Sequence, residues 1–164
     1  LKFNFKNGLF MKHKGYFLLF LVLVLSDQFT KQIFMTSFDL GQSVAINPYL
    51  SWTYLHNKGA AFSILSDGGS IGKLFLLMVS ILVSLWLIWW AQKTPAIYKQ
   101  KLFGQFFLLS GAVGNLIDRA LYGYVIDFID VHVNSFYWPV FNLADSFIFI
   151  GVALIIFERK STTQ

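Results

Sequence analysis

Two aspartates, Asp127 and Asp145, lie in short segments that contain no basic side chain to pair with their charge. Asp127 falls in GYVIDF and Asp145 in FNLADS, and long apolar runs adjoin both segments. Desolvating an ionised carboxylate is expensive unless the group is paired or takes up a proton. If the two carboxylates meet, they share one proton, because like charges about 3 Å apart cannot both ionise cheaply. The charged member can activate water while the protonated one polarises a carbonyl, as in an aspartic peptidase. A proton relay or a metal site would use the same carboxylates, so these alternatives stay open.

Other polar side chains recur at helical spacing near these aspartates. Asp27 and Lys31 are four residues apart and share a helix face, so they can neutralise each other or join two helices. Asn115, Asp118 and Arg119 also share one face, and a buried structural network is the alternative to a functional role. We further expect Asn142 to point the same way as Asp145, three residues later on the last apolar run.

Small residues accompany these polar groups. Gly111 and Gly114 permit the close backbone approach that small residues give between membrane helices. Gly59, followed by Ala60 and Ala61, suits a surface that a peptide or acyl chain passes closely, and a tight turn is the alternative.

The composition is that of a membrane protein. Of the 164 residues 56% are hydrophobic and only 13% are charged, against about 25% charged in an average soluble domain. This length predicts a single domain, residues 1–164. The absence of cysteine excludes disulfides, thiolate nucleophiles and Cys-ligated metals. His13, His56 and His132 are too scattered to indicate a ligand set, so we expect no metal and no cofactor.

Four apolar runs predict an all-α membrane protein with four transmembrane helices. Each run approaches the ~20 residues that cross the hydrocarbon core, and together they cover residues 16–35, 71–91, 102–121 and 140–157. SDQFTK follows the first run in place of a small-residue cleavage site, so we expect that run to be retained. Pro139 suits the first turn of the last helix, which would place Asp145 about 9 Å along it.

The basic residues predict the orientation. They gather in three places: Lys2, Lys6, Lys12 and Lys14; Lys93, Lys99 and Lys101; and Arg159 and Lys160. The connection 36–70 has only Lys58, and the connection 122–139 has no Lys or Arg. Since basic loops stay cytoplasmic, both termini should be inside and the two aspartates outside. The net charge of +5 reflects this asymmetry and gives no reason to expect a nucleic-acid partner. Residues 1–10 are an extension ahead of Met11 whose order the sequence leaves open.

The first outer connection predicts a small β-containing region. YLSWTYL is rich in strand-forming residues and is bounded by turn residues on both sides, although an ordinary loop is the alternative. Tyr49, Trp52 and Tyr54 in this segment suit a sheet lying on the membrane interface. Asp127 is expected in the other outer connection, a few residues beyond the third helix.

Five ordered blocks of the chain resemble the lipoprotein signal peptidases (signal peptidase II), which are aspartyl peptidases of the bacterial inner membrane. The blocks are DQFTK, NKGAAF, GAVGNLIDR, GYVIDF and FNLADS, and the resemblance runs from about residue 16 to 157. It implies that Asp127 and Asp145 are the catalytic pair. Asp118 is the competitor, because it too stands in a family block, although Arg119 beside it gives it a structural role.

The resemblance also implies a substrate class and a set of supporting residues. Family substrates are prolipoproteins with a diacylglyceryl group on a cysteine, and the family cuts them on the N-terminal side of that cysteine. We expect this protein to act in the membrane as a monomer. The supporting or substrate-binding residues would be Asn57, Gly59, Asn115, Asp118, Arg119, Asn142, Ala144, Asp27 and Lys31. A proton-coupled carrier or a structural subunit is the alternative, but carriers usually show internal repeats and polar residues at the bilayer midplane.

Overall fold

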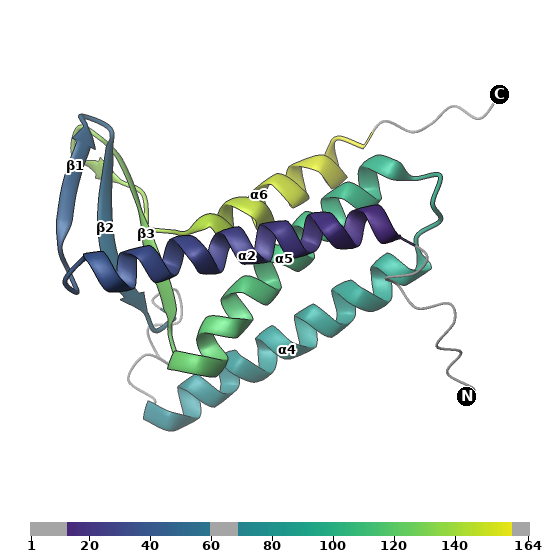
Figure 1. The fold of residues 1–164 in the computed structure, drawn as a ribbon, viewed down its shortest axis with the longest axis horizontal. Coiled ribbons are helices and arrows are strands. Elements are labelled where there is room, and N and C mark those ends of the chain that lie inside the picture. The colour runs from purple at the N-terminus through teal and green to yellow at the C-terminus, as the bar shows by residue number, and fades with distance from the viewer. Residues whose placement is uncertain (1–12, 60–68, 159–164) are drawn as a thin grey trace.

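The computed structural model describes residues 13–59 and 69–158, which form long helices and a small antiparallel sheet (Figure 1). The predictions made for residues 1–10 and for Ala60 and Ala61 lie outside these ranges. The helices are α2 (Lys14–Ser37), α4 (Gly69–Lys93), α5 (Lys99–Tyr122) and α6 (Leu143–Ile156). The strands are β1 (Ser43–Asn47), β2 (Leu50–Asn57), β3 (Val125–Val133) and β4 (Phe136–Tyr137), in the sheet order β1-β2-β3-β4.

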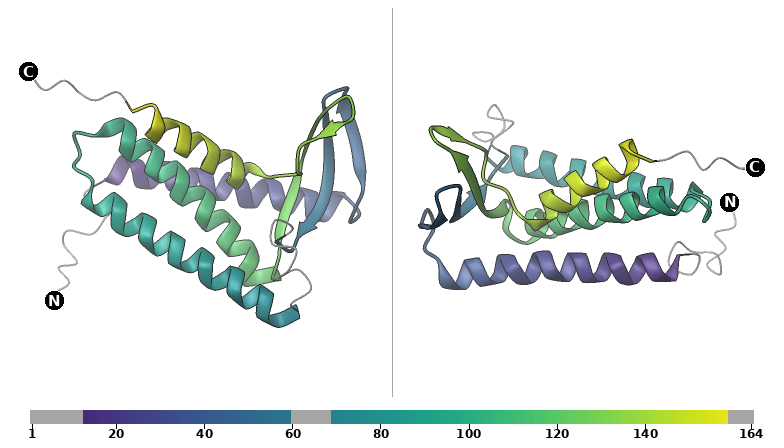
Figure 2. Two further views of the ribbon diagram at one scale, coloured as in Figure 1. Left: turned by 180° about the vertical axis from the view of Figure 1, so that it is seen from behind. Right: turned by 90° about the horizontal axis from the view of Figure 1, so that it is seen from above.

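The helices lie side by side, and the sheet sits at one end of them. The start of α2 and the end of α6 lie together at the other end (Figures 1 and 2). Helix α5 is central and contacts α2, α4 and α6. By length and composition α2 and residues 70–93 of α4 could each cross a membrane, whereas α6 is apolar but shorter. Helix α5 is more polar, and its polar side chains Gln105, Ser110, Asn115 and Asp118 are buried.

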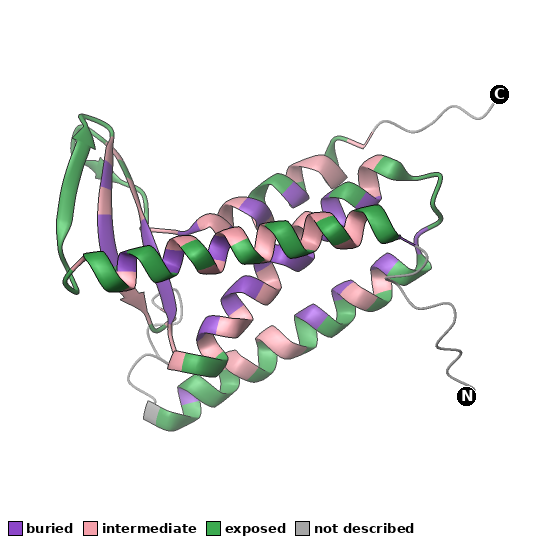
Figure 3. Cartoon of the chain, in the orientation of Figure 1, coloured by how far each residue is buried: buried purple, intermediate pink, exposed green. Residues whose placement is uncertain are grey.

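The two outermost long helices turn large apolar side chains outward (Figure 3). On α4, Ile71 is 79% exposed and Leu82 is 62% exposed, and on α2 Leu25 and Phe29 are exposed to a similar degree. Continuous apolar surface of this kind is rare on soluble monomers and marks a membrane or protein contact. The fold is therefore mostly helical with lipid-compatible outer faces, as the composition predicted.

Close contact between α5 and α6 depends on glycine, as expected for Gly111. A Cβ atom on Gly111 would collide with the carbonyl oxygen of Ala144. At the far end of the same interface, a Cβ on Gly104 would come within 2.8 Å of the carbonyl oxygen of Gly151. Small residues of this kind allow two helix backbones to approach in a membrane.

The sheet confirms the strand predicted in YLSWTYL and adds three strands that were not predicted, β1, β3 and β4. Strand β2 pairs with β1 on one side and β3 on the other, both antiparallel. Asp127 therefore lies in a strand, opposite Leu55, and not in a loop. The β-branched residues of VIDFIDVHV are a signal that could have predicted β3.

The sheet is anchored on the end of α2 by aromatic packing. Phe34 stacks on Phe128 with ring centroids 4.3 Å apart, and Trp52 meets Phe34 edge-on at 5.7 Å. Tyr54 is 6% exposed and belongs to this cluster, so its predicted place at the membrane interface is wrong, whereas Tyr49 is 61% exposed. The cluster fixes the position of β3 and hence of the residues that it carries.

Helix α6 begins at Leu143, and the predicted start at Pro139 is wrong. Residues 139–141 are extended, and Phe141 exchanges backbone hydrogen bonds with Ile129 at 2.7 and 3.0 Å. The side chain of Asn142 then caps the helix by accepting from the Asp145 N–H at 2.9 Å. Asp145 therefore lies in the first turn of α6 and not about 9 Å along a helix.

Candidate active site

Asp127 and Asp145 are linked through two asparagine side chains. Asn142 Nδ2 donates to Asp127 Oδ1 at 2.7 Å, and Asn115 Nδ2 donates to Asp145 Oδ1 at 2.8 Å. The two amides are themselves joined, because Asn142 Nδ2 also lies 3.2 Å from Asn115 Oδ1. Residues from β3, α5 and the start of α6 therefore meet in one hydrogen-bonded chain.

Asp127 is buried, with 2% of its surface exposed. Its second oxygen, Oδ2, accepts from Asn57 Nδ2 at 2.9 Å, so both carboxylate oxygens face amide donors. The pKa of Asp127 is raised to about 7, chiefly by burial. The charge of Asp145 also raises the pKa, whereas the hydrogen bonds from Asn57 and Asn142 lower it. A carboxyl group with this pKa can hold a proton near neutral pH.

Asp145 is half-buried and occupies a different electrostatic environment. It completes a capping box with Asn142, whose backbone N–H lies 3.4 Å from Asp145 Oδ2. Negative charge in the first turn of a helix is favoured by the helix dipole. The two carboxylates thus differ in the way that an acid and a base in one site must differ.

An open, mostly apolar groove of about 690 Å³ adjoins Asp145. It lies between the β3–β4 hairpin and the first turns of α6. Its lining residues are Val131, His132, Val133, Phe136, Trp138, Phe141, Asp145, Ser146, Phe149 and Ile150. Asp145 and His132 are the titratable groups among these lining residues. The Ser146 hydroxyl in the lining donates to the Asn142 carbonyl at 3.0 Å.

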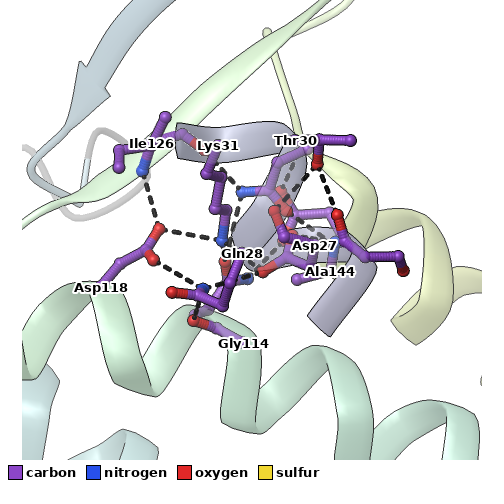
Figure 4. Close-up of polar contacts among 12 residues, drawn as sticks. Asp27, Gln28, Thr30, Lys31, Gly114, Asp118, Ile126 and Ala144 are labelled. Atoms are coloured by element: carbon purple, nitrogen blue, oxygen red, sulfur yellow. Dashed lines mark hydrogen bonds and ion pairs between the residues drawn. The ribbon is translucent and has the colours of Figure 1, made fainter. Parts of the chain in front are cut away.

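Asp118 lies deeper, in a buried ionic cluster (Figure 4). Lys31 Nζ is 2.9 Å from Asp118 Oδ2 and 2.9 Å from Asp27 Oδ2, so the predicted Asp27–Lys31 pair is confirmed. The partner of Asp118 is Lys31 and not Arg119, because adjacent helical residues point about 100° apart. Asp118 faces α2, and the competing candidate is fully engaged inside the protein.

Arg119 lies close enough to three carboxylates to interact with them electrostatically. Its Nη1 lies 3.4 Å from the Asn115 carbonyl, and its charge interacts with the carboxylate of Asp145 more than with those of Asp118 and Asp127. Among the residues that the structure describes, no carboxylate lies within ion-pair distance of Arg119. The guanidinium therefore keeps most of its donors for another group.

Gly59 and Ala144 support the site through the backbone. The Gly59 N–H donates to Asn57 Oδ1 at 2.9 Å, in a turn where Gly59 has a φ of +93°. That turn orients the Asn57 amide towards Asp127, which favours the tight-turn interpretation of this segment. Ala144 is fully buried, and its N–H donates to Asp27 Oδ1 at 2.9 Å.

A family model described as Signal peptidase (SPase) II matches residues 19–159. The chain belongs to the signal peptidase II family. It is 42% identical over 132 residues to a lipoprotein signal peptidase of Alteromonas mediterranea, covering 80% of this chain and 72% of that protein. It is 43% identical over 138 residues to one of Pseudoalteromonas translucida, covering 84% and 83%. The protein is accordingly a peptidase.

Two solved structures share the fold. Both are bacterial membrane enzymes determined by the in meso method, one at 2.3 Å and one at 1.9 Å resolution. The first has a TM-score of 0.77 at 36% identity and covers 87% of this chain and 85% of its own. The second has a TM-score of 0.79 at 34% identity and covers 92% and 95%. These similarities and the apolar outer helices point to a bacterial membrane protein.

Sequence reasoning missed two features of this signal peptidase II site. Gln28 stands in the DQFTK block, and its Nε2 lies 3.0 Å from Asp118 Oδ1 and 3.1 Å from Asp27 Oδ2. The position of Gln28 next to Asp27 in the DQFTK block is the sequence feature that could have indicated its place in the site. The groove residues Phe136 and Trp138 were also missed, because their segment was treated as a loop.

Proposed function

We propose that the protein is an aspartic endopeptidase that removes signal peptides from diacylglyceryl-modified prolipoproteins. The cut falls on the N-terminal side of the lipidated cysteine. The observation that carries the proposal is the asparagine-linked pair of carboxylates, one buried with a raised pKa and one at a helix N-terminus. The names of the curated relatives, lipoprotein signal peptidases, support the substrate class.

The reaction divides between the two aspartates. Asp145, as the carboxylate, takes a proton from a water molecule whose oxygen bonds to the scissile carbonyl carbon. Asp127, as the acid, gives its proton to the carbonyl oxygen. When the tetrahedral intermediate collapses, the C–N bond breaks, Asp145 returns its proton to the departing cysteine nitrogen, and Asp127 recovers a proton from the hydroxyl group. Asn115 and Asn142 hold the two carboxylates in place.

The substrate fits the surroundings of the pair. The apolar groove beside Asp145 suits an acyl chain, and the nearby Asp145 then faces the peptide bond next to the lipidated cysteine. Arg119 would donate to a substrate carbonyl, since its guanidinium has no carboxylate partner among the described residues. A lipid anchor in the groove would fix the position of the bond to be cut, which lowers the entropic barrier of reaction.

We also propose that all four helices cross the membrane with the sheet outside. Lys14 of α2, Lys93 of α4 and Lys99 of α5 lie at helix ends away from the sheet, as expected for a cytoplasmic side. Helix α6 has 14 residues and spans about 21 Å, less than the ~30 Å hydrocarbon core. Its first turn, with Asp145, would then sit slightly below the outer surface.

The decisive experiment is cleavage in vitro of a diacylglyceryl-modified prolipoprotein by the purified protein. Asp127→Asn and Asp145→Asn should each lower turnover by at least ~10²–10⁴-fold, because each removes a proton-transfer group. Asp130→Asn is the matched control, since Asp130 lies on the same strand but accepts from Thr53 Oγ1 at 2.9 Å. It should retain near-normal activity. A prolipoprotein without the lipid should be a poor substrate.

Two results would contradict the proposal. Near-normal turnover by Asp127→Asn would exclude the assigned pair. Inhibition by EDTA that zinc reverses would instead indicate a metal enzyme, although no three His, Asp or Glu side chains group as a metal site within residues 13–59 and 69–158.

A further inference from the structure

The residue immediately before each of the two aspartates is held by a buried carboxylate. Ala144 precedes Asp145, and its backbone N–H donates to Asp27 Oδ1 at 2.9 Å. Ile126 precedes Asp127, and its backbone N–H donates to Asp118 Oδ2 at 3.0 Å. Figure 4 shows both contacts entering the same cluster from opposite sides.

Each contact adds a restraint to a backbone N–H next to one of the aspartates. Ala144 is the second residue of α6, so its N–H has no partner within the helix. Ile126 begins the part of β3 that carries Asp127. A restraint one residue away from a catalytic side chain fixes its Cα position, although it never touches the reacting atoms.

Lys31 and Gln28 join the two restraints into one unit. Lys31 Nζ contacts Asp27 Oδ2, Asp118 Oδ2 and, at 3.1 Å, Asn115 Oδ1. Gln28 Nε2 contacts Asp27 and Asp118 as well. Asp27 and Asp118 are fully buried, and Lys31 is 1% exposed. The Asn115 contact ties the unit directly to the amide that binds Asp145.

We propose that Asp27, Lys31 and Asp118 form a positioning unit that sets the separation of the Asp127 and Asp145 carboxylates. This inference rests on the proposed function of that pair. Stability alone gives little reason for such a unit, because replacing buried ion pairs with apolar residues is often neutral or stabilising. Catalysis does give a reason, since a misplacement of about 1 Å can lower the rate about 10²-fold.

Gly114 offers a substitution that disturbs the unit without removing a charge. A Cβ atom on Gly114 would lie 2.6 Å from Asp27 Oδ2 and 3.2 Å from Ala144 Cβ, so Gly114→Ala should displace this carboxylate and also press directly on Ala144. Gly104→Ala is the matched control on the same helix. Its Cβ would lie 2.8 Å from the Gly151 carbonyl oxygen, at the end of the α5–α6 interface away from the aspartates.

Cleavage kinetics should separate positioning from stability. We expect Gly114→Ala to lower kcat about 10- to 100-fold with KM within about twofold of wild type. Gly104→Ala should lower the thermal unfolding temperature and leave kcat unchanged. Wild-type kcat in Gly114→Ala, or equal losses of kcat in the two variants, would overturn the proposal.

A readout without substrate separates this proposal from the proposed function. The titration of the Asp127 carboxyl, followed by carbon-13 NMR in micelles, should shift to lower pH in Gly114→Ala, because Asp145 moves away. It should not shift in Gly104→Ala. If wild-type protein fails to cut the lipidated substrate, the proposed function fails. The positioning unit can still be tested then, and it fails if this titration is the same in both variants.

A second pair of variants applies if Gly114→Ala does not fold. Asp118→Asn keeps an oxygen that can accept from the Ile126 N–H, whereas Asp118→Leu has none. The order of kcat should be wild type, then Asp118→Asn, then Asp118→Leu. Equal kcat in Asn and Leu variants, measured on folded protein, would refute positioning through this hydrogen bond.

Discussion

At the scale of single residues, the proposed chemistry depends on how Asp127 holds its proton. Burial raises its pKa to about 7, so Asp127 is protonated below that pH and charged above it. We therefore expect kcat/KM to fall as the pH rises through about 7. Asn57 donates to the charged form and lowers the pKa. Asn57→Ala should consequently move this alkaline limb to higher pH, as a pH–rate profile would measure.

The pH–rate profile can contradict this prediction directly. A limb that moves to lower pH in Asn57→Ala would mean that Asn57 does not stabilise the charged form of Asp127. Asn47→Ala is a suitable control, because Asn47 caps the β1–β2 turn through the Tyr49 N–H at 2.8 Å, away from the aspartates. Its limb should coincide with that of the wild type.

Arg119 gives a second test at the residue scale. If it donates to a substrate carbonyl, Arg119→Lys should raise KM or lower kcat and leave folding intact. Lysine keeps the charge but loses the planar fork of donors. Cleavage kinetics together with thermal unfolding in detergent would measure both effects. Wild-type kinetics in Arg119→Lys, combined with a large loss of stability in Arg119→Ala, would show a purely structural role.

At the scale of elements, Asn142 at the start of α6 caps the helix and, in the proposed mechanism, holds Asp127. Its Oδ1 caps the helix, and its Nδ2 donates to Asp127. Serine is an equally good cap but has no amide donor. Asn142→Ser should therefore keep most of the stability and lose activity, whereas Asn142→Ala should lose both, with about 1 kcal/mol from the cap. Equal activity in wild type and Asn142→Ser would exclude the donor role.

The helices α5 and α6 show why the four predicted spans differ in character. Helix α5 is surrounded by other helices, so its inward polar residues need partners in the protein and not lipid. Helix α6 is shorter than a typical span because residues before Leu143 join the sheet. The sequence shows that the third run contains polar residues and that the fourth is short, but the partners of those polar residues come only from the packing.

At the scale of the whole molecule, orientation in the membrane follows from the ends of the bundle. A reporter fused between Gln92 and Lys101 should read cytoplasmic, because this connection is basic and lies away from the sheet. A reporter inserted at the β3–β4 turn, at Asn134, should read external. An external reading at Lys99 would overturn the four-span topology and place the site on the wrong side for a lipoprotein exported from the cell.

The sequence by itself determined the apolar helices, the strand around Trp52 and the polar residues that the structure brings together. Periodicity and composition suffice there, because they depend on local spacing and on the solvent each segment needs. It also identified the Asp27–Lys31 pair, since helical spacing fixes which residues share a face.

Only the tertiary structure decided which faces meet. Helical spacing placed Arg119 beside Asp118, but the packing of α2 on α5 gave Asp118 to Lys31. The pairing of β3 with β2 brought Asn57 to Asp127. These contacts join residues tens of positions apart. They depend on how helices and strands pack in three dimensions, which local sequence patterns do not encode.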